Sequence, residues 1–166
     1  MSAKKKAAAT VPDLPRVDPT KMRINRITMI HGKLEATEAY LNKPEPPAQV
    51  KVDFGHRSGI GWKAERTWHR LYVELAALDD KGSPLGLTAS YVFEFHFTIQ
   101  GLGDFAKKLD DGALAIHPVM ANTLMGIMFS TVRGMVLERT KGTYFDGVVL
   151  PVIAPGDLSK SWREGE

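Results

Sequence analysis

The chain has 166 residues, a formal net charge of +3 at pH 7, and hydrophobic and charged fractions of 43% and 25%. This composition is that of a globular protein, which excludes a disordered or fibrous chain, and the length suits one domain. Because the sequence has no cysteine, disulfide bonds, cysteine-bound zinc and thiol nucleophiles are also excluded.

Charge and hydropathy also bear on location and partners. Lys4, Lys5 and Lys6 precede too short an apolar stretch for a signal peptide, and no apolar run approaches the roughly 20 residues of a membrane span. We therefore expect a soluble, cytoplasmic protein with no membrane insertion. Outside this basic tail, Lys and Arg are interleaved with Asp and Glu instead of forming one stretch, so no nucleic-acid partner is expected.

The chain begins with a segment that has little to bury. Residues 1–21 are rich in Lys, Ala and Pro and show no apolar period, which predicts a disordered tail. Residues 23–34 predict a first strand of irregular phase, since Ile24 and Ile27 fall on opposite faces of a regular strand. A β-bulge, or a strand buried on parts of both faces, would explain that change of phase.

Three later segments predict the other strands of one antiparallel sheet. Residues 50–54 alternate strictly, and a glycine-containing loop is expected over 55–62. Residues 68–78 alternate again, and a hairpin over 79–84 leads to residues 85–99, where the alternation is longest. Together with the first strand they predict a four-stranded antiparallel meander with one buried and one partly wet face.

One long helix follows the sheet. Pro118 suits a first helical position, and Gly142 suits a stop after residue 139. The apolar positions of this helix exceed the stripe that one sheet can cover, so a second subunit is expected to cover the remainder. Residues 144–155 predict an extended segment packed on the core. The expected organisation is the 1–21 tail, one domain over 22–155, and a short tail over 156–166.

The sequence offers few groups for catalysis. None of the five histidines pairs with another at helical metal-binding spacing, and no nucleophile, phosphate-loop or dinucleotide motif is present. Glu94 and His96 share one face of a predicted strand and are the best start for a site. His56, Arg57 and Ser58 stand in the predicted glycine loop, where an anion site is a weaker option than a plain turn. A cap or turn role, rather than a ligand role, is expected for His117, which precedes Pro118.

Several short segments carry a family resemblance. They are Ile-Asn-Arg-Ile at 24–27, Val-Lys-Val-Asp-Phe at 50–54, Phe-Thr-Ile-Gln-Gly at 97–101, Arg-Thr-Lys-Gly-Thr at 139–143 and Leu-Pro-Val at 150–152. In this order and spacing they resemble the SecB-type protein-export chaperones, over nearly all of residues 22–155.

The resemblance implies an α+β protein in which a four-stranded antiparallel meander packs with a long helix and assembles into a dimer or a homotetramer. It implies that the protein is not an enzyme but an ATP-independent holdase. Such a holdase binds unfolded or precursor polypeptides in apolar grooves and needs no cofactor or metal. By this resemblance Val50, Val52 and Phe54 match groove-lining positions, and Trp62 is assigned to the same peptide-binding set.

Some positions depart from the family pattern. In the family, carboxylates on the sheet face dock the SecA motor, whereas the matching positions here hold His31 and Ser90, and only Glu35 is retained. The second long helix of the family is missing or reduced to a stub after Pro155. The resemblance therefore does not decide whether the protein docks to SecA. It is compatible with a role in protein export and with a role in a toxin–antitoxin system.

Two other functional classes stay open. A small apolar-ligand or acyl-binding protein would show a similar order of strands and helix and would need an enclosed apolar pocket. An enzyme of unknown type on the same scaffold would need a polar pair, such as Glu94 and His96, inside that pocket.

Overall fold

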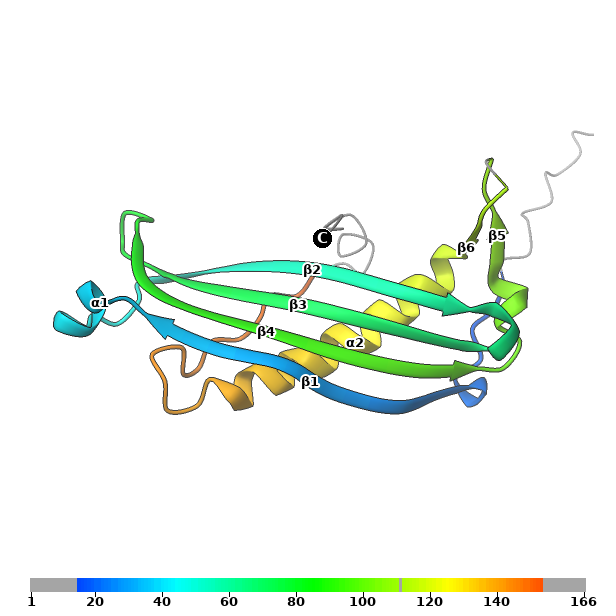
Figure 1. Cartoon of the computed structure of the whole chain (residues 1–166), viewed down its shortest axis with the longest axis horizontal. Coiled ribbons are helices and arrows are strands. Elements are labelled where there is room, and N and C mark those ends of the chain that lie inside the picture. The colour runs from blue at the N-terminus through cyan, green and yellow to red at the C-terminus, as the bar shows by residue number, and fades with distance from the viewer. Residues whose placement is uncertain (1–14, 111, 154–166) are drawn as a thin grey trace, which may run out of the picture.

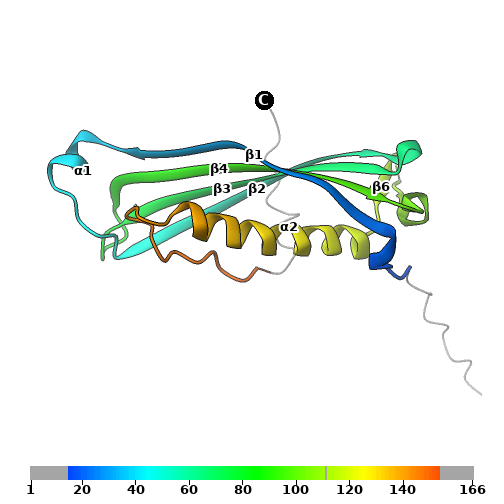
Figure 2. The same ribbon diagram turned by 90° about the horizontal axis from the view of Figure 1, so that it is seen from below.

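The computed structural model describes residues 15–110 and 112–153. One antiparallel sheet with the strand order β1-β4-β3-β2 lies across a long helix, α2, which covers one of its faces (Figure 1; Figure 2). The bounds are β1 Met22–Ala36, β2 Gln49–Gly61, β3 Arg66–Leu78, β4 Pro84–Ile99 and α2 Pro118–Arg139. The expected α+β class, with a four-stranded antiparallel sheet and one long helix, is confirmed.

Short elements sit at the two ends of the sheet. They are the 3-10 helices η1 Pro19–Lys21, η2 Trp62–Ala64 and η3 Leu102–Phe105, the helix α1 Glu38–Asn42, and the strands β5 Ala106–Lys108 and β6 Leu114–Ile116. Helix α1 lies at one end, and β5 and β6 form a separate ribbon at the other (Figure 1). Neither α1 nor this ribbon could be predicted from the sequence, because segments of three to five residues carry too little periodicity.

Strand β4 is the centre of the fold. Its odd-numbered residues face α2 and are buried, and its even-numbered residues face away from the helix. The longest alternation in the sequence thus belongs to a strand with neighbours on both sides. The core formed on the helix side includes Leu71, Leu75, Phe93, Phe95, Phe97, Leu124, Met128 and Val132.

The order of the strands differs in one respect from their order in the sequence. Strands β2, β3 and β4 follow one another as a meander, but β1 pairs with β4 rather than with β2. The segment between β1 and β2 therefore crosses the end of the sheet, through α1. As a result, β1 and β2 are the two edge strands.

The irregular phase of β1 has the predicted cause. The register with β4 shifts between Ile24 and Arg26 and again between Met29 and His31. Each shift inserts one residue, so Ile24 and Ile27 both face the helix side although they are three residues apart. The predicted bulge is confirmed.

The glycine-containing loop expected over 55–62 is wrong, because β2 continues to Gly61. Gly55 pairs with Tyr72 and Gly59 with Trp68 on the side of the sheet away from the helix. A methyl group on Gly59 would collide with the Trp68 indole, so glycine here makes room for a neighbouring ring. A glycine that looks like part of a loop in the sequence therefore serves side-chain packing across the strands.

The ends of α2 are those that the sequence predicts. Val119 N–H donates to Nδ1 of His117 at 3.3 Å, so the expected cap is confirmed. Thr140 caps the other end, and Gly142 takes a left-handed φ of 72°. This helix has the length and hydropathy of a membrane span, but seven of its side chains are buried in the core, as in the core helix of a sheet protein.

The chain after α2 turns back along the helix side of the sheet (Figure 1; Figure 2). Phe145 and Leu150 of this segment are buried in the core, so the chain itself supplies part of the second covering surface that the wide helix requires. Before β1, Val17 also packs on the core and Asp18 caps η1, so contacts begin within the expected 1–21 tail. Residues 1–14 of that tail and the expected 156–166 tail lie outside the described residues.

Candidate functional site

The first three predicted peptide-binding residues form one row on the edge strand β2. Val50, Val52 and Phe54 all face α2, and all three are half-buried against the core. The ring of Phe54 meets that of Phe129 of the helix edge to face, with centroids 5.1 Å apart. The structure therefore brings these three side chains together beside the helix, at the rim of the core.

Trp62, the fourth predicted residue, lies apart from that row. It sits in η2, in the turn after β2, where it is half-buried with Ile60 beside it in the sequence. Eight residues separate Phe54 from Trp62, or about 26 Å along a strand. Because β2 continues as a strand to Gly61, Trp62 lies at the far end of β2 from Val50.

A pair of histidines interrupts the apolar row between Phe54 and Ile60. Nε2 of His56 and Nδ1 of His69 lie 3.1 Å apart with their rings stacked, and Nε2 of His69 lies 3.0 Å from Oγ1 of Thr67. Burial, and then the nearby His56 and His96, lower the pKa of His69 to about 3, and burial also lowers the pKa of His56. The pair is neutral at pH 7, and His56 is no part of an anion-binding loop.

The opposite edge carries a second apolar row that sequence reasoning missed. Ile24, Ile27 and Leu34 of β1 point to the helix side, yet Ile24 is 42% and Leu34 47% exposed. Ile30, in the second bulge, is exposed as well. This row could not be recognised from the sequence, because its exposure follows from the place of β1 at the edge of the sheet.

The methionines of α2 contribute less to an open surface than their number suggests. Met120, Met125 and Met128 are buried in the core, and only Met135 is half-buried. Their side chains pack the interior between helix and sheet. The methionines of α2 are therefore mainly core residues.

The face of the sheet away from α2, called the outer face below, carries the polar pair singled out in the sequence. Oε1 of Glu94 lies 2.7 Å from Nε2 of His96, and Oε2 accepts from Nε of Arg70 at 2.7 Å. Nη2 of Arg26 lies 3.4 Å from Oε1. The bond to His96, with Arg70 next, lowers the pKa of Glu94 to about 2. A carboxylate held ionised in this way is no general acid.

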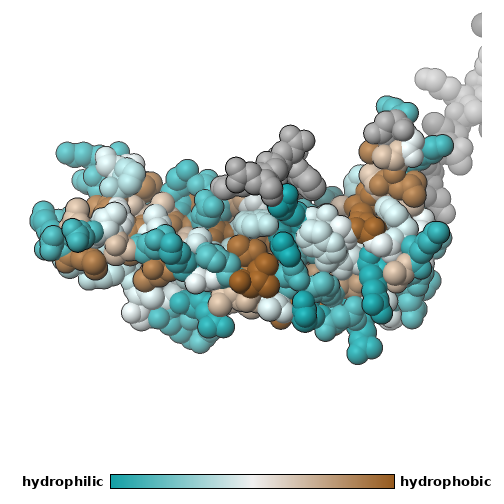
Figure 3. Space-filling view, viewed as in Figure 1, coloured by the Kyte–Doolittle hydropathy of each residue, from teal (hydrophilic) through white to brown (hydrophobic). Residues whose placement is uncertain are grey.

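Two of the sheet-face positions discussed above bond to each other. Nε2 of His31 and Oγ of Ser90 lie 3.1 Å apart on adjacent strands of the outer face. Glu35, further along β1, lies 2.6 Å from Nζ of Lys33. Figure 3 looks onto this face, where hydrophilic residues are interspersed with several hydrophobic areas.

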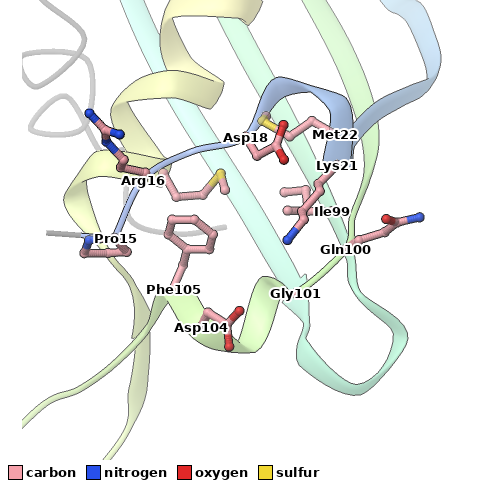
Figure 4. Close-up of a pocket in the computed structure, with 11 residues that line it drawn as sticks. Pro15, Arg16, Asp18, Lys21, Met22, Ile99, Gln100, Gly101, Asp104 and Phe105 are labelled. Carbon is pink, nitrogen blue, oxygen red and sulfur yellow. The ribbon is translucent and has the colours of Figure 1, made fainter. Parts of the chain in front are cut away.

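A hollow of about 250 Å³ lies at the end of the sheet next to η3 (Figure 4). Its lining is mixed, with Ile99 and Phe105 beside the charged Asp18, Lys21 and Asp104. It is smaller than the roughly 300–1,000 Å³ of a small-molecule site, and charged side chains interrupt its apolar lining. Among residues 15–110 and 112–153, no group of three potential metal ligands occurs.

Comparison with known proteins supports the fold. No family model and no curated protein sequence matches the chain. Among solved structures, it is similar to the Mycobacterium tuberculosis SecB-like chaperone Rv1957 in complex with a ChAD peptide from the HigA1 antitoxin. The TM-score is 0.57 with 14% identity, over 81% of this chain and 92% of that one. The chain therefore has a divergent SecB-like fold.

A Streptococcus agalactiae protein of unknown function is also similar, with 16% identity over 79% of this chain and 97% of that one. Its TM-score is 0.38, too low to support an argument.

Proposed function

We propose that the chain is an ATP-independent chaperone that holds unfolded polypeptides against the edge of its sheet. One observation carries the proposal: Val50, Val52 and Phe54 form an apolar row on an edge strand, pack on the helix, and remain half exposed. An extended peptide can lie along such a row and use many weak side-chain contacts, which give affinity without demanding one sequence. These three residues form the proposed contact surface, and Trp62 marks its far end.

The similar Mycobacterium tuberculosis chaperone supports this ligand class, because its structure contains a bound peptide from an antitoxin. We therefore propose polypeptides rather than small molecules as ligands, in a cytoplasmic setting. The polypeptide is either an antitoxin, as in the similar chaperone, or a precursor protein that is to be exported. Docking to SecA through sheet carboxylates is not part of the proposal, because His31 and Ser90 occupy those positions and contact each other.

A binding function also fits the polar groups better than an enzymatic one. Glu94 has both oxygens engaged and a pKa of about 2, so it stays ionised at pH 7. His56 and His69 are directed at each other and at Thr67 within the helix side. Neither set lines the hollow next to η3.

We also propose that the chain associates with itself through β1. The row Ile24, Ile27 and Leu34 is exposed along an edge strand in a single copy, which is a costly arrangement for a lone subunit. A second copy that covers this row would leave β2 at the free edges for client polypeptide.

The holdase proposal is tested by dilution of a chemically unfolded client in the presence of the protein, with aggregation followed by light scattering. The wild type should suppress scattering at micromolar amounts. The variant Val52→Ser/Phe54→Ser should lose most of that suppression, because it removes apolar contact area on the helix side of β2. The matched control is Lys51→Ser/Asp53→Ser, which changes the same strand on its outer face.

Two results would count against the proposal. One is client aggregation that the wild type does not change. The other is equal suppression by the Val52→Ser/Phe54→Ser variant and the control, when far-ultraviolet circular dichroism shows that both are folded.

A further inference from the structure

Arginines from three strands gather on one half of the outer face. Arg23 and Arg66 flank Thr98 of β4, and Arg26 and Trp68 flank His96 in the next row. Arg70 lies beside Glu94 one row further, and Arg57 of β2 is opposite Arg70. This cluster, called the arginine face below, consists of Arg23, Arg26, Arg57, Arg66 and Arg70 around Trp68.

The sheet brings together arginines that are interleaved with acidic residues along the sequence. Arg66, Trp68 and Arg70 alternate with inward-facing Thr67 and His69, so strand periodicity places all three on the outer face. Arg23 and Arg26 are three residues apart, but both face outward because the first bulge of β1 lies between them. Residues that are mixed with acids along the chain are therefore concentrated in space.

The positive charge of the arginine face is only partly neutralised. Glu94 is its one carboxylate, and it lies buried beneath Arg70 and Arg26. Arg23, Arg57 and Arg66 form no ion pair with any residue that the structure describes. At pH 7 the face carries five guanidinium groups against one carboxylate, and so attracts anions.

The arginine face is also hollowed. A depression of about 520 Å³ lies over its outer row and is lined in part by Lys21, Arg23, Asn25, Arg66 and Thr98. Four of these side chains can donate hydrogen bonds from amine, amide or guanidinium nitrogens, with one hydroxyl between them. A carboxylate that enters this depression meets donors from three strands and from η1.

Trp68 gives the face an apolar anchor. Its indole packs where Gly59 leaves room on β2, and the side chain is 38% exposed. The Arg70 guanidinium carbon lies 5.4 Å from the centre of the ring. Tryptophan and arginine are the residue types that dominate binding energy at protein interfaces, and the guanidinium fork matches carboxylates.

The other half of the outer face lacks this excess of positive charge. Glu35, Asp53 and Glu74 line a second depression there, of about 260 Å³. Lys33 pairs with Glu35 and Lys51 with Asp53, which leaves the half without an excess of positive charge. A nucleic-acid strand continuing along the sheet would meet these carboxylates, whereas a short acidic peptide can end before them.

We propose that the arginine face binds an acidic polypeptide segment, with its carboxylates on Arg23, Arg57 and Arg66 and an apolar side chain on Trp68. This surface lies on the face of the sheet opposite the proposed client row of Val50, Val52 and Phe54. It is therefore a second protein-binding site, for a partner defined by charge rather than by unfolded structure.

The test uses the full chain and fluorescein-labelled peptides of about eight residues, which extend to about 26 Å and can cross the four strands. One peptide is rich in Glu with a single Leu, one carries Lys in place of each Glu, and a third probe is a single-stranded oligonucleotide of similar length. Fluorescence anisotropy should show binding of the Glu peptide, about tenfold weaker in the variant Arg23→Glu/Arg66→Glu. Added salt should weaken it as well.

The control variant Lys43→Glu/Lys81→Glu makes the same change in net charge at the far end of the molecule, where both lysines are exposed. It should retain the affinity of the wild type. The proposal is overturned if the oligonucleotide binds more tightly than the Glu peptide, or if the Lys peptide binds as well. Equal loss of affinity in the control, or no binding of the Glu peptide at low salt, overturns it as well. Because Val52→Ser/Phe54→Ser should leave this binding intact, the result is independent of the holdase proposal.

Discussion

His56 and His69 place a titratable pair among apolar neighbours on the helix side of the sheet. In the unfolded chain a histidine takes up a proton as the pH falls through about 6.5, whereas the folded pKa of His69 is about 3. Between these values the unfolded state binds more protons than the folded state. The free energy of unfolding therefore decreases as the pH falls through this range.

The first prediction concerns this dependence. Urea unfolding should give a free energy lower at pH 5 than at pH 7, by up to about 2 kcal/mol from His69. The range above pH 4.5 isolates the histidines, because Glu94, with its lowered pKa, loses its stabilising contribution only below that value. The variant His69→Leu should flatten the dependence, and His31→Leu on the outer face should not. Equal stability of the wild type at both pH values would contradict the neutral pair.

A second prediction at the residue scale concerns the contact between Gly59 and Trp68. Gly59→Ala should displace the indole and lower the free energy of unfolding by about 1 kcal/mol, with a change in near-ultraviolet circular dichroism. Gly103→Ala is the matched control, because a methyl group there meets no atom within 4 Å. An unchanged near-ultraviolet spectrum for Gly59→Ala would show that the ring does not pack there.

At the scale of elements, α2 carries much of the core through a few buried side chains. Met128→Ala should lower the free energy of unfolding by about 2–5 kcal/mol, because it leaves a cavity between helix and sheet. Met135→Ala, on the same helix but half-buried, should cost less than about 1 kcal/mol. Urea unfolding of the two variants measures the difference, and equal losses would mean that Met135 is covered as completely as Met128.

The elements also show how far the sequence predicts the structure. The bounds of α2 follow from Pro118 and from the stop near Gly142, and β4 follows from its long alternation, because both signals are local. The second half of β2 was missed, since Gly59 is explained only by Trp68 on the neighbouring strand.

Strand order limited the prediction of the sites. Val50, Val52 and Phe54 could be grouped from the sequence because they share one short strand. The cluster of Arg26, Glu94 and Arg70 requires β4 to lie between β1 and β3, and no local pattern contains that information. The exposed apolar row of β1 could not be predicted for the same reason, because it depends on β1 lying at the edge of the sheet.

At the scale of the whole molecule, the proposed self-association predicts a mass that depends on β1. Light scattering after size exclusion should give an oligomer for the wild type. Ile27→Lys/Leu34→Lys should reduce it to a monomer, because lysines would replace exposed apolar contacts. Thr28→Lys/His31→Lys adds the same charge to the outer face of that strand and should leave the mass unchanged. A wild type that is strictly monomeric at all concentrations would exclude this association.

The pairing of β1 with β4 also has a consequence for synthesis on the ribosome. Ala36 pairs with Leu87 and Met22 with Ile99, so each pair is separated by 51 to 77 residues of chain. At roughly 5–20 residues per second, the first strand waits roughly 3–15 s after its own translation before its partner emerges. During that interval its isoleucines have no sheet to join, while β2, β3 and β4 can pair as local hairpins as soon as they appear. The nascent chain of this proposed chaperone is thus itself, for several seconds, the kind of unfolded polypeptide that a chaperone binds.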